Sequence, residues 1–177
     1  MLIKSISHSG KQSPKLLIKY IFDKRKSLTD AHGDRLIFKQ HLRSYDKDKW
    51  THQFNDMESK RQSHYGKKSV VCYHEVVSFS PQSTKHLNRS ILKDLVSRYI
   101  RLRTEGKQLC IGAIHFDKGK NWHAHLVFSG IRTTDFKSAR ISKSKLASIK
   151  KEIQAYQIKT YPELSDSIVR HGLKKKD

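Results

Sequence analysis

Two apolar segments joined by a short polar turn constrain the fold of this chain more than any other feature. Residues 108–116 read QLCIGAIHF and residues 122–129 read WHAHLVFS, and each has the length and composition of a buried strand. The intervening DKGKN contains the Asp, Gly and Asn that are typical of tight turns. Strands joined by so short a connection must pair antiparallel, because a parallel pair needs a long crossover. The sequence therefore predicts a β-hairpin at the centre of the fold.

Further strands and helices are expected on both sides of this hairpin. Residues 69–81, SVVCYHEVVSFSP, are typical of a strand, and residues 1–7 alternate weakly like an edge strand. Apolar residues recur at helical spacing in three segments, 13–22, 87–102 and 146–156. Residues 40–69 are polar, with His, Lys, Gln and Ser throughout, and are expected to be loop and solvated helix.

Together these elements predict a single α+β domain over residues 1–165. Its sheet is expected to be mainly antiparallel, with about five strands, and its helices are expected to pack on one face. Residues 166–177, which end in RHGLKKKD, are expected to form a basic, flexible tail.

The charge of the chain points to a polyanionic partner. Lys and Arg number 37 against 16 Asp and Glu, which gives a formal net charge of +21. A domain this basic repels itself unless a polyanion is bound, so nucleic acid is the expected partner. The chain has no apolar run long enough to span a bilayer and no signal-peptide core, so we expect no membrane insertion and a cytoplasmic location. Cys72 and Cys110 lie in apolar segments and are expected to be buried free thiols.

Three histidines lie on the predicted hairpin where their side chains can meet. Residues two apart in a strand point to the same face, so the side chains of His123 and His125 share one face, as do those of His115 and Asp117. Across an antiparallel pair, His115 can approach the other two to within about 5 Å. Three converging neutral imidazoles make a metal site with open coordination positions, suited to polarising a phosphoryl oxygen. The alternative is that they are polar members of a half-exposed sheet face.

The same stretch, HFDKGKNWHAH at residues 115–125, resembles the metal-binding motif of the conjugative relaxases. These are plasmid-mobilisation nucleases of the HUH endonuclease superfamily. YHEVVSFSP at residues 73–81 resembles the strand that precedes this motif in relaxases. LLIKYIFDKRKS at residues 16–27 resembles their first motif, which contains the nucleophilic tyrosine. The three motifs also follow one another in the relaxase order.

The resemblance implies a metal-dependent, single-strand-specific DNA nickase and strand transferase. A tyrosine would attack a phosphodiester at an origin of transfer and leave a covalent 5′-phosphotyrosine and a free 3′-hydroxyl. His115, His123 and His125 would hold Mg²⁺ or Mn²⁺. The expected partners are single-stranded DNA at the origin, accessory mobilisation proteins and a coupling protein. The alternatives are a rolling-circle replication initiator or transposase of the same superfamily, and a non-catalytic DNA-binding accessory protein.

Tyr20 is the expected nucleophile, because it matches the tyrosine of the first relaxase motif. Without that match, it equally fits the aromatic end of an apolar helix face. Tyr156 is the alternative nucleophile, because YQIK at 156–159 resembles the Y-x-x-K motif of replication initiators, although Tyr156 also continues an apolar helix face. Six basic residues are expected to bind phosphates beside the site: Lys19, Lys24, Arg25, Lys26, Lys118 and Lys120.

Two acidic residues are expected to support the site. Asp117 can orient His123 or His125 through a hydrogen bond, accept the tyrosine proton, or simply begin the turn. Glu75 matches an acid that supports a metal-binding histidine in related mobilisation nucleases, and a buried carboxylate needs a partner. His74 points away from Glu75 in a regular strand and is expected to be structural.

Overall fold

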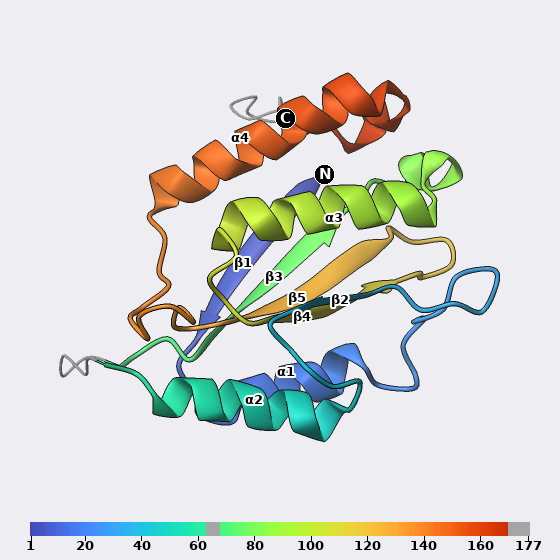
Figure 1. Cartoon of the computed structure of the whole chain (residues 1–177). Helices are drawn as coiled ribbons and strands as arrows, with labels where there is room; N and C mark the ends of the chain where they lie inside the picture. The colour runs from blue at the N-terminus through green and yellow to red at the C-terminus, as the bar shows by residue number, and fades with distance from the viewer. Residues whose placement is uncertain (63–67, 170–177) are drawn as a thin grey trace, which may run out of the picture.

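Five strands form one antiparallel sheet in the computed structural model of the chain, which describes residues 1–62 and 68–169 (Figure 1). The order is β1-β3-β5-β4-β2, so β1 and β2 are the edge strands. The strands are β1 (Leu2–His8), β2 (Ile37–Gln40), β3 (Cys72–Ser78), β4 (Cys110–His115) and β5 (His123–Ser129). The helices are α1 (Ser13–Ile21), α2 (Lys47–Ser59), α3 (Arg89–Thr104) and α4 (Lys143–Thr160), with short 3₁₀ helices η1 (Pro81–His86) and η2 (Pro162–Ser167). The predicted α+β class and five-stranded antiparallel sheet are confirmed.

The predicted central hairpin is formed by β4 and β5. His115 pairs directly with His123, and the chain reverses at Gly119, whose φ of +67° is one that glycine adopts without strain. At Gly112 there is no room for a side chain, because any Cβ would collide with the main-chain carbonyl of His125. The hairpin therefore depends on glycine both in its turn and within β4.

Helices cover both faces of the sheet, with α3 and α4 on one face and α1 and α2 on the other (Figure 1). The core on the α3 face includes Tyr73, Val77, Leu92, Tyr99 and Phe128, and the core on the α1 face includes Ile18, Ile21, Trp50, Phe54 and Ile111. The expectation of helices on one face is therefore wrong. The physical reason is visible in the hairpin, because β4 is buried at every position and β5 at all but its first. A strand covered on both sides is continuously apolar rather than alternating.

In α2 an amphipathic helix forms where the sequence predicted loop and solvated helix over residues 40–69. Asp46 caps it by accepting hydrogen bonds from two amides of the first turn. Trp50 and Phe54 lie one turn apart and are each only 2% exposed, so this face packs against the sheet. The prediction of a solvated helix holds for the outer face of α2 and fails for its inner face. Residues 63–67 lie outside the described part of the chain.

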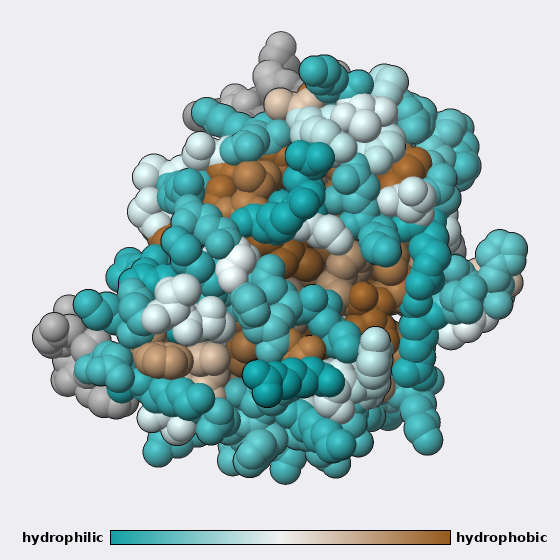
Figure 2. Space-filling model, viewed as in Figure 1, coloured by the Kyte–Doolittle hydropathy of each residue, from teal (hydrophilic) through white to brown (hydrophobic). Residues whose placement is uncertain are grey.

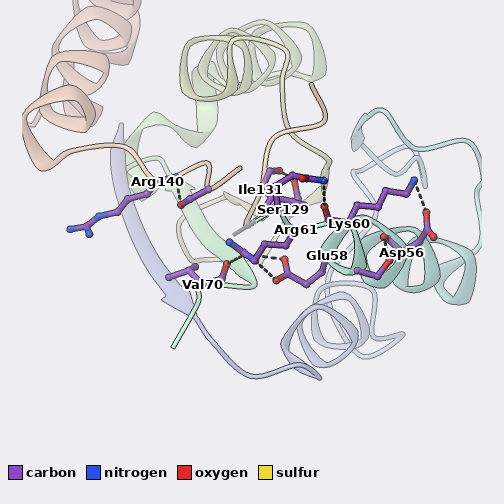
Figure 3. Close-up of polar contacts among 11 residues, drawn as sticks. Asp56, Glu58, Lys60, Arg61, Val70, Ser129, Ile131 and Arg140 are labelled. Carbon is purple, nitrogen blue, oxygen red and sulfur yellow. Dashed lines mark hydrogen bonds and ion pairs between the residues drawn. The ribbon is translucent and has the colours of Figure 1, made fainter. Parts of the chain in front are cut away.

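The C-terminal end of α2 is fixed to the sheet by Arg61 (Figure 3). Its guanidinium pairs with Glu58 at N–O distances of 2.6 and 3.0 Å and donates to the carbonyl of Val70 at 2.8 Å. The Arg61 side chain is almost fully buried, so water screens this ion pair less than a surface pair. These contacts hold α2 beneath the sheet on the α1 face.

One strand was not identified in the sequence, and the packed region ends later than expected. The edge strand β2 has only four residues, too short for its apolar pattern to be recognised in the sequence. Ser167 is buried, contacts the hydroxyl of Ser83 at 2.6 Å and accepts a hydrogen bond from the amide of Ser80. The packed region therefore extends past residue 165, into the segment 166–177 that was expected to be a flexible tail. Residues 170–177 lie outside the described residues. Within the described ranges, no helix has the length and apolar character needed to cross a bilayer.

Candidate metal centre and nucleophile

Three histidine rings converge on the α1 face of the sheet, where β4 ends and β5 begins. His115 lies directly opposite His123, and His125 follows on the same face of β5. The ring centroids are 4.5 to 5.3 Å apart, and one nitrogen from each ring lies within 4.8 Å of the other two. The predicted convergence of the three imidazoles is confirmed.

Main-chain carbonyl groups orient two of these rings. His115 donates from Nε2 to the carbonyl of Ile21 at 2.9 Å, and His123 donates from Nδ1 to the carbonyl of Asn121 at 2.8 Å. Because a carbonyl only accepts, each of these nitrogens carries the proton and the other ring nitrogen carries a lone pair. Both imidazoles are therefore held in tautomers that can ligate a cation.

The third ring, His125, is oriented by another histidine. Its Nδ1 lies 2.9 Å from Nε2 of His74, and the two rings stack at a centroid distance of 5.2 Å. Nε2 of His125 is buried and has no hydrogen-bond partner among the described residues. A buried nitrogen without a partner is costly in a folded protein unless a ligand satisfies it. The donor set and this nitrogen together fit a divalent metal ion held by the three histidines.

Burial favours the neutral form of two of these rings, His115 and His125. Burial lowers the pKa of His125 to about 2, with smaller contributions from His115, His123, His74 and Lys26 in that order. Burial also lowers the pKa of His115, although its hydrogen bond to a carbonyl acts in the opposite direction. Neutral imidazoles keep their lone pairs, so both rings remain available as ligands at physiological pH.

Tyr20 lies beside the histidine cluster, one residue before the end of α1. Its ring centroid is 5.5 Å from that of His125 and 6.4 Å from that of His115. The side chain is 45% exposed, so a nucleic-acid strand can reach it from solvent. Its position follows from the packing of α1, because Ile21 is buried against the sheet and its carbonyl holds His115. The spatial arrangement that the Tyr20 prediction required is present.

Tyr156, the alternative nucleophile, lies on the other face of the sheet. Its hydroxyl donates to Asp94 at 2.9 Å, and the guanidinium of Arg98 lies 3.6 Å from its ring centroid. The same Asp94 oxygen also accepts a hydrogen bond from Tyr161 at 2.7 Å. These contacts join α4 to α3, and both helices lie on the face of the sheet opposite α1 (Figure 1). The geometry therefore gives Tyr156 a packing role.

Glu75 does not support a metal-binding histidine, which corrects the expectation from the sequence. It is fully buried on the α3 face, where it pairs with Arg103 at 2.9 Å. It also accepts hydrogen bonds from Ser5, at 2.9 Å, and from Tyr99. The physical reason is strand parity, because Glu75 pairs with Leu126 and so faces away from His125. Glu75 instead joins the sheet to α3.

His74 takes the place on the α1 face that was expected for the acid. Val76 pairs with His125 across β3 and β5, so His74, two residues earlier on the same face, reaches the ring of His125. Burial lowers the pKa of His74, so this ring is also neutral. The signal that identifies His74 is the pairing register of β3 and β5, which the sequence does not contain.

Comparison with known proteins places this site in a family. A family model described as the nuclease domain of MobA/VirD2-like relaxases matches residues 20–159, which include Tyr20 and all three histidines. The chain belongs to this family. It is therefore a relaxase nuclease domain, a DNA-cleaving enzyme. A search of curated proteins finds no significant match.

The fold of this relaxase domain is also that of two solved structures. A conjugative relaxase, TrwC, solved with metal and origin-of-transfer DNA, superposes with a TM-score of 0.58 at 12% identity, covering 97% of this chain and 73% of its own. A structure described as the molecular basis of vancomycin resistance transfer in Staphylococcus aureus gives a TM-score of 0.58 at 15% identity, covering 94% of this chain and 95% of its own. At these identities the likeness establishes the fold alone.

Asp117 of the relaxase domain is half-buried after β4. Its charge acts to raise the pKa of His115, so the two groups are close. The expected hydrogen bond from His123 or His125 to Asp117 is not formed within the described structure, because those rings use Asn121 and His74 instead. A role for Asp117 in accepting the tyrosine proton stays a prediction.

The basic residues predicted near the site are placed in three ways. Lys26 is the most direct neighbour, with Nζ 4.2 Å from the ring centroid of Tyr20. Arg25 is committed to Asp23 through two hydrogen bonds of 2.7 and 3.0 Å, so it is less available for a phosphate than predicted. The remaining four are exposed, in or just after α1 and in the β4–β5 turn: Lys19, Lys24, Lys118 and Lys120.

Proposed function

We propose that this relaxase domain nicks single-stranded DNA at an origin of transfer, with Tyr20 as the nucleophile. The observation that carries the proposal is the position of Tyr20, whose exposed ring lies 5.5 Å from His125 at the edge of the three-histidine cluster. Membership of the relaxase family supports it, and so does the solved TrwC relaxase, which was bound to origin-of-transfer DNA and metal.

The reaction is a transesterification at one phosphodiester. The hydroxyl oxygen of Tyr20 bonds to phosphorus while the bond from phosphorus to the 3′ oxygen breaks. The tyrosine proton passes to a base, for which Asp117 is our candidate, and the departing 3′ oxygen takes up a proton. The products are a 5′-phosphotyrosine and a free 3′-hydroxyl. Reversal by the 3′-hydroxyl of another strand rejoins the DNA, because the covalent link keeps the energy of the broken bond.

His115, His123 and His125 would hold the cation, with Mg²⁺ or Mn²⁺ as the proposed ion. When bound, such an ion stabilises the charge that develops on the phosphate oxygens. The chain itself supplies orientation, through the carbonyl groups of Ile21 and Asn121 that fix two of the rings. Phosphates on either side of the nick would be held by the basic residues around Tyr20 and in the β4–β5 turn: Lys19, Lys24, Lys26, Lys118 and Lys120.

The test is to incubate the protein with a library of single-stranded oligonucleotides and Mn²⁺ and to detect covalent protein–DNA species under denaturing conditions. Wild type should form an adduct, Tyr20→Phe should form none, and Tyr156→Phe should form it normally. An adduct with Tyr20→Phe would contradict the nucleophile assignment. Salt-sensitive DNA binding by wild type without any adduct would instead favour a non-catalytic DNA-binding protein.

The origin of transfer also defines the expected partners. We propose single-stranded DNA as the direct ligand, with accessory mobilisation proteins and a coupling protein as further partners. The basic surface supports the DNA ligand, because a net charge of +21 on 177 residues favours binding to a polyanion.

A further inference from the structure

A groove lies between the edge strand β2 and α3, on the face of the sheet opposite the histidines. It has a volume of about 340 Å³ and is lined by Ile37–Gln40 of β2 and by Lys93, Ser97, Ile100 and Arg101 of α3. We call it the α3–β2 groove. In Figure 2, apolar surface is visible between α3 and the sheet edge and is bordered by hydrophilic side chains.

The cations of the α3–β2 groove are not neutralised by the protein. Among the residues that the structure describes, Lys39, Lys93 and Arg101 form no ion pair with a carboxylate. Asp94 of α3 accepts hydrogen bonds from two tyrosines of the α4 region, and Glu105, directly after α3, pairs with two lysines outside the groove. The groove therefore presents uncompensated positive charge.

The spacing of these side chains is regular. Lys93, Ser97 and Arg101 are each four residues apart, so they form one stripe along α3, with a rise of about 6 Å between successive members. That rise is comparable to the distance between successive phosphates of a nucleic-acid strand. A stripe of two cations and a hydroxyl matches a repeating anion better than it matches a single small ligand.

An exposed aromatic ring lies at the same edge of the sheet as the groove, but on the α1 face. Lys39 pairs with Ile111 of the α1-face core, so its side chain points away from Lys93 and Arg101. Tyr45, in the loop between β2 and α2, is 84% exposed, the highest value among the large apolar side chains of the described structure. The ammonium of Lys39 lies 3.4 Å from its ring centroid and donates to the carbonyl of Ser44 at 3.2 Å. A solvent-facing ring beside a cation is a combination that proteins use to stack unpaired bases.

We propose that the α3–β2 groove binds a second segment of the DNA substrate, with Lys93 and Arg101 contacting phosphates. Tyr45, on the α1 side of β2, would stack on a base of the strand that runs from Tyr20 to the groove. The inference rests on the proposed function, because it extends the DNA path away from the nick. Ile37 of β2 pairs with Ala113, two residues before His115, so the groove begins close to the metal centre on the opposite face. A strand that leaves Tyr20 reaches the groove by passing around β2, which is an edge of the sheet.

The test compares two double variants that remove the same charge. Lys93→Ala with Arg101→Ala alters the groove, and Lys151→Ala with Lys159→Ala alters exposed residues of α4 with the same eight-residue separation. Binding of an oligothymidylate of about 30 nucleotides is measured by fluorescence anisotropy over a range of salt concentrations. The groove variant should bind about tenfold more weakly at low salt, and its salt slope should fall by about 1.4, the value for two lost phosphate contacts. The α4 variant should change little.

A stacking contact is tested separately at Tyr45. Tyr45→Ala should weaken binding about fivefold or more, whereas Tyr45→Phe should bind like wild type because the ring is retained. Equal losses of DNA affinity in the groove double variant and the α4 double variant would overturn the proposal. So would a groove variant that loses affinity for polyglutamate but not for DNA, since that result would assign the groove to an acidic peptide.

The two proposals fail in different ways. If the groove variant binds DNA like the α4 variant while wild type forms the Tyr20 adduct, the groove assignment is wrong and the nickase proposal stands. If wild type forms no adduct but the groove variant binds DNA weakly, the nickase proposal is wrong and the groove assignment stands.

Discussion

Removing the ring of His74 should weaken metal binding at a site that His74 does not itself ligate. Nε2 of His74 lies 2.9 Å from Nδ1 of His125, whose side chain is only 6% exposed. For Nε2 of His125 to ligate a cation, Nδ1 must carry the proton and donate it to His74. His74→Ala removes that acceptor and leaves the metal-bound form with a buried, unsatisfied N–H.

The size of the effect follows from this unsatisfied group. A buried donor without a partner costs about 1–3 kcal/mol. Without the cation the proton is not confined to Nδ1 and the ring is not held in place, so more of this cost falls on the metal-bound state. The affinity should therefore fall by about 10- to 100-fold, the range found when groups behind metal ligands are removed.

The assay is calorimetric titration of the metal-free protein with Mn²⁺ at mildly alkaline pH. His52→Ala, which removes an exposed histidine of α2, is the matched control and should bind like wild type. His74→Gln should recover most of the affinity, because its amide oxygen can accept the same proton. Wild-type affinity in His74→Ala would refute the reasoning, and so would a His74→Gln protein that binds as weakly as His74→Ala.

Three further predictions test the sheet around the site. Glu75→Gln should lower the free energy of unfolding by about 3 kcal/mol in urea, because Arg103 is left as an uncompensated buried charge, but it should leave Mn²⁺ affinity unchanged. Gly112→Ala should lower the free energy of unfolding by about 1–3 kcal/mol and weaken Mn²⁺ binding, because the added methyl meets Leu126 and displaces β5 at His125. Burial raises the pKa of the Cys72 thiol from 9.0 to about 12, so the unfolded chain ionises first and stability falls as pH rises above 9. Between about pH 8 and about pH 10 the loss should be about 1.4 kcal/mol greater in wild type than in Cys72→Ala.

Each of these has a result that would count against it. A loss of Mn²⁺ affinity in Glu75→Gln would restore the acid to the metal centre. Unchanged stability in Gly112→Ala would mean that β4 and β5 do not approach as closely as described. Equal pH dependence in wild type and Cys72→Ala would show that this buried thiol, whose burial the sequence correctly predicted, is not protected from ionisation.

The local sequence pattern predicted the structure correctly wherever the contacts that determine it are between residues close in sequence. The hairpin followed from two apolar segments and a Gly-containing turn, and period-2 parity then placed three histidines on one face without knowledge of any other strand. The helical segments that contain Tyr20 and Tyr156 were found for the same reason, because helical periodicity is a property of neighbouring residues.

Contacts between distant segments were not predictable in this way. Glu75 and His74 are adjacent, so the sequence permits either to face the metal centre, and only the register of β3 against β5 decides between them. The polar composition of the α2 segment predicted loop and solvated helix. Its one apolar face, formed by Trp50 and Phe54, was recognised only from its packing against the sheet. The groove beside β2 likewise depends on two elements that are about fifty residues apart in the sequence.

The sequence by itself determined the hairpin, the cluster of His115, His123 and His125, and the positive charge of the chain, because these depend on spacing and composition alone. Only the tertiary structure brought Tyr20 to the cluster, put Tyr156 on the other face, and exchanged the expected roles of His74 and Glu75. These placements depend on the packing of segments that are distant in sequence. The free energy that favours them comes from surface buried between elements, and the residues of a single element do not determine it.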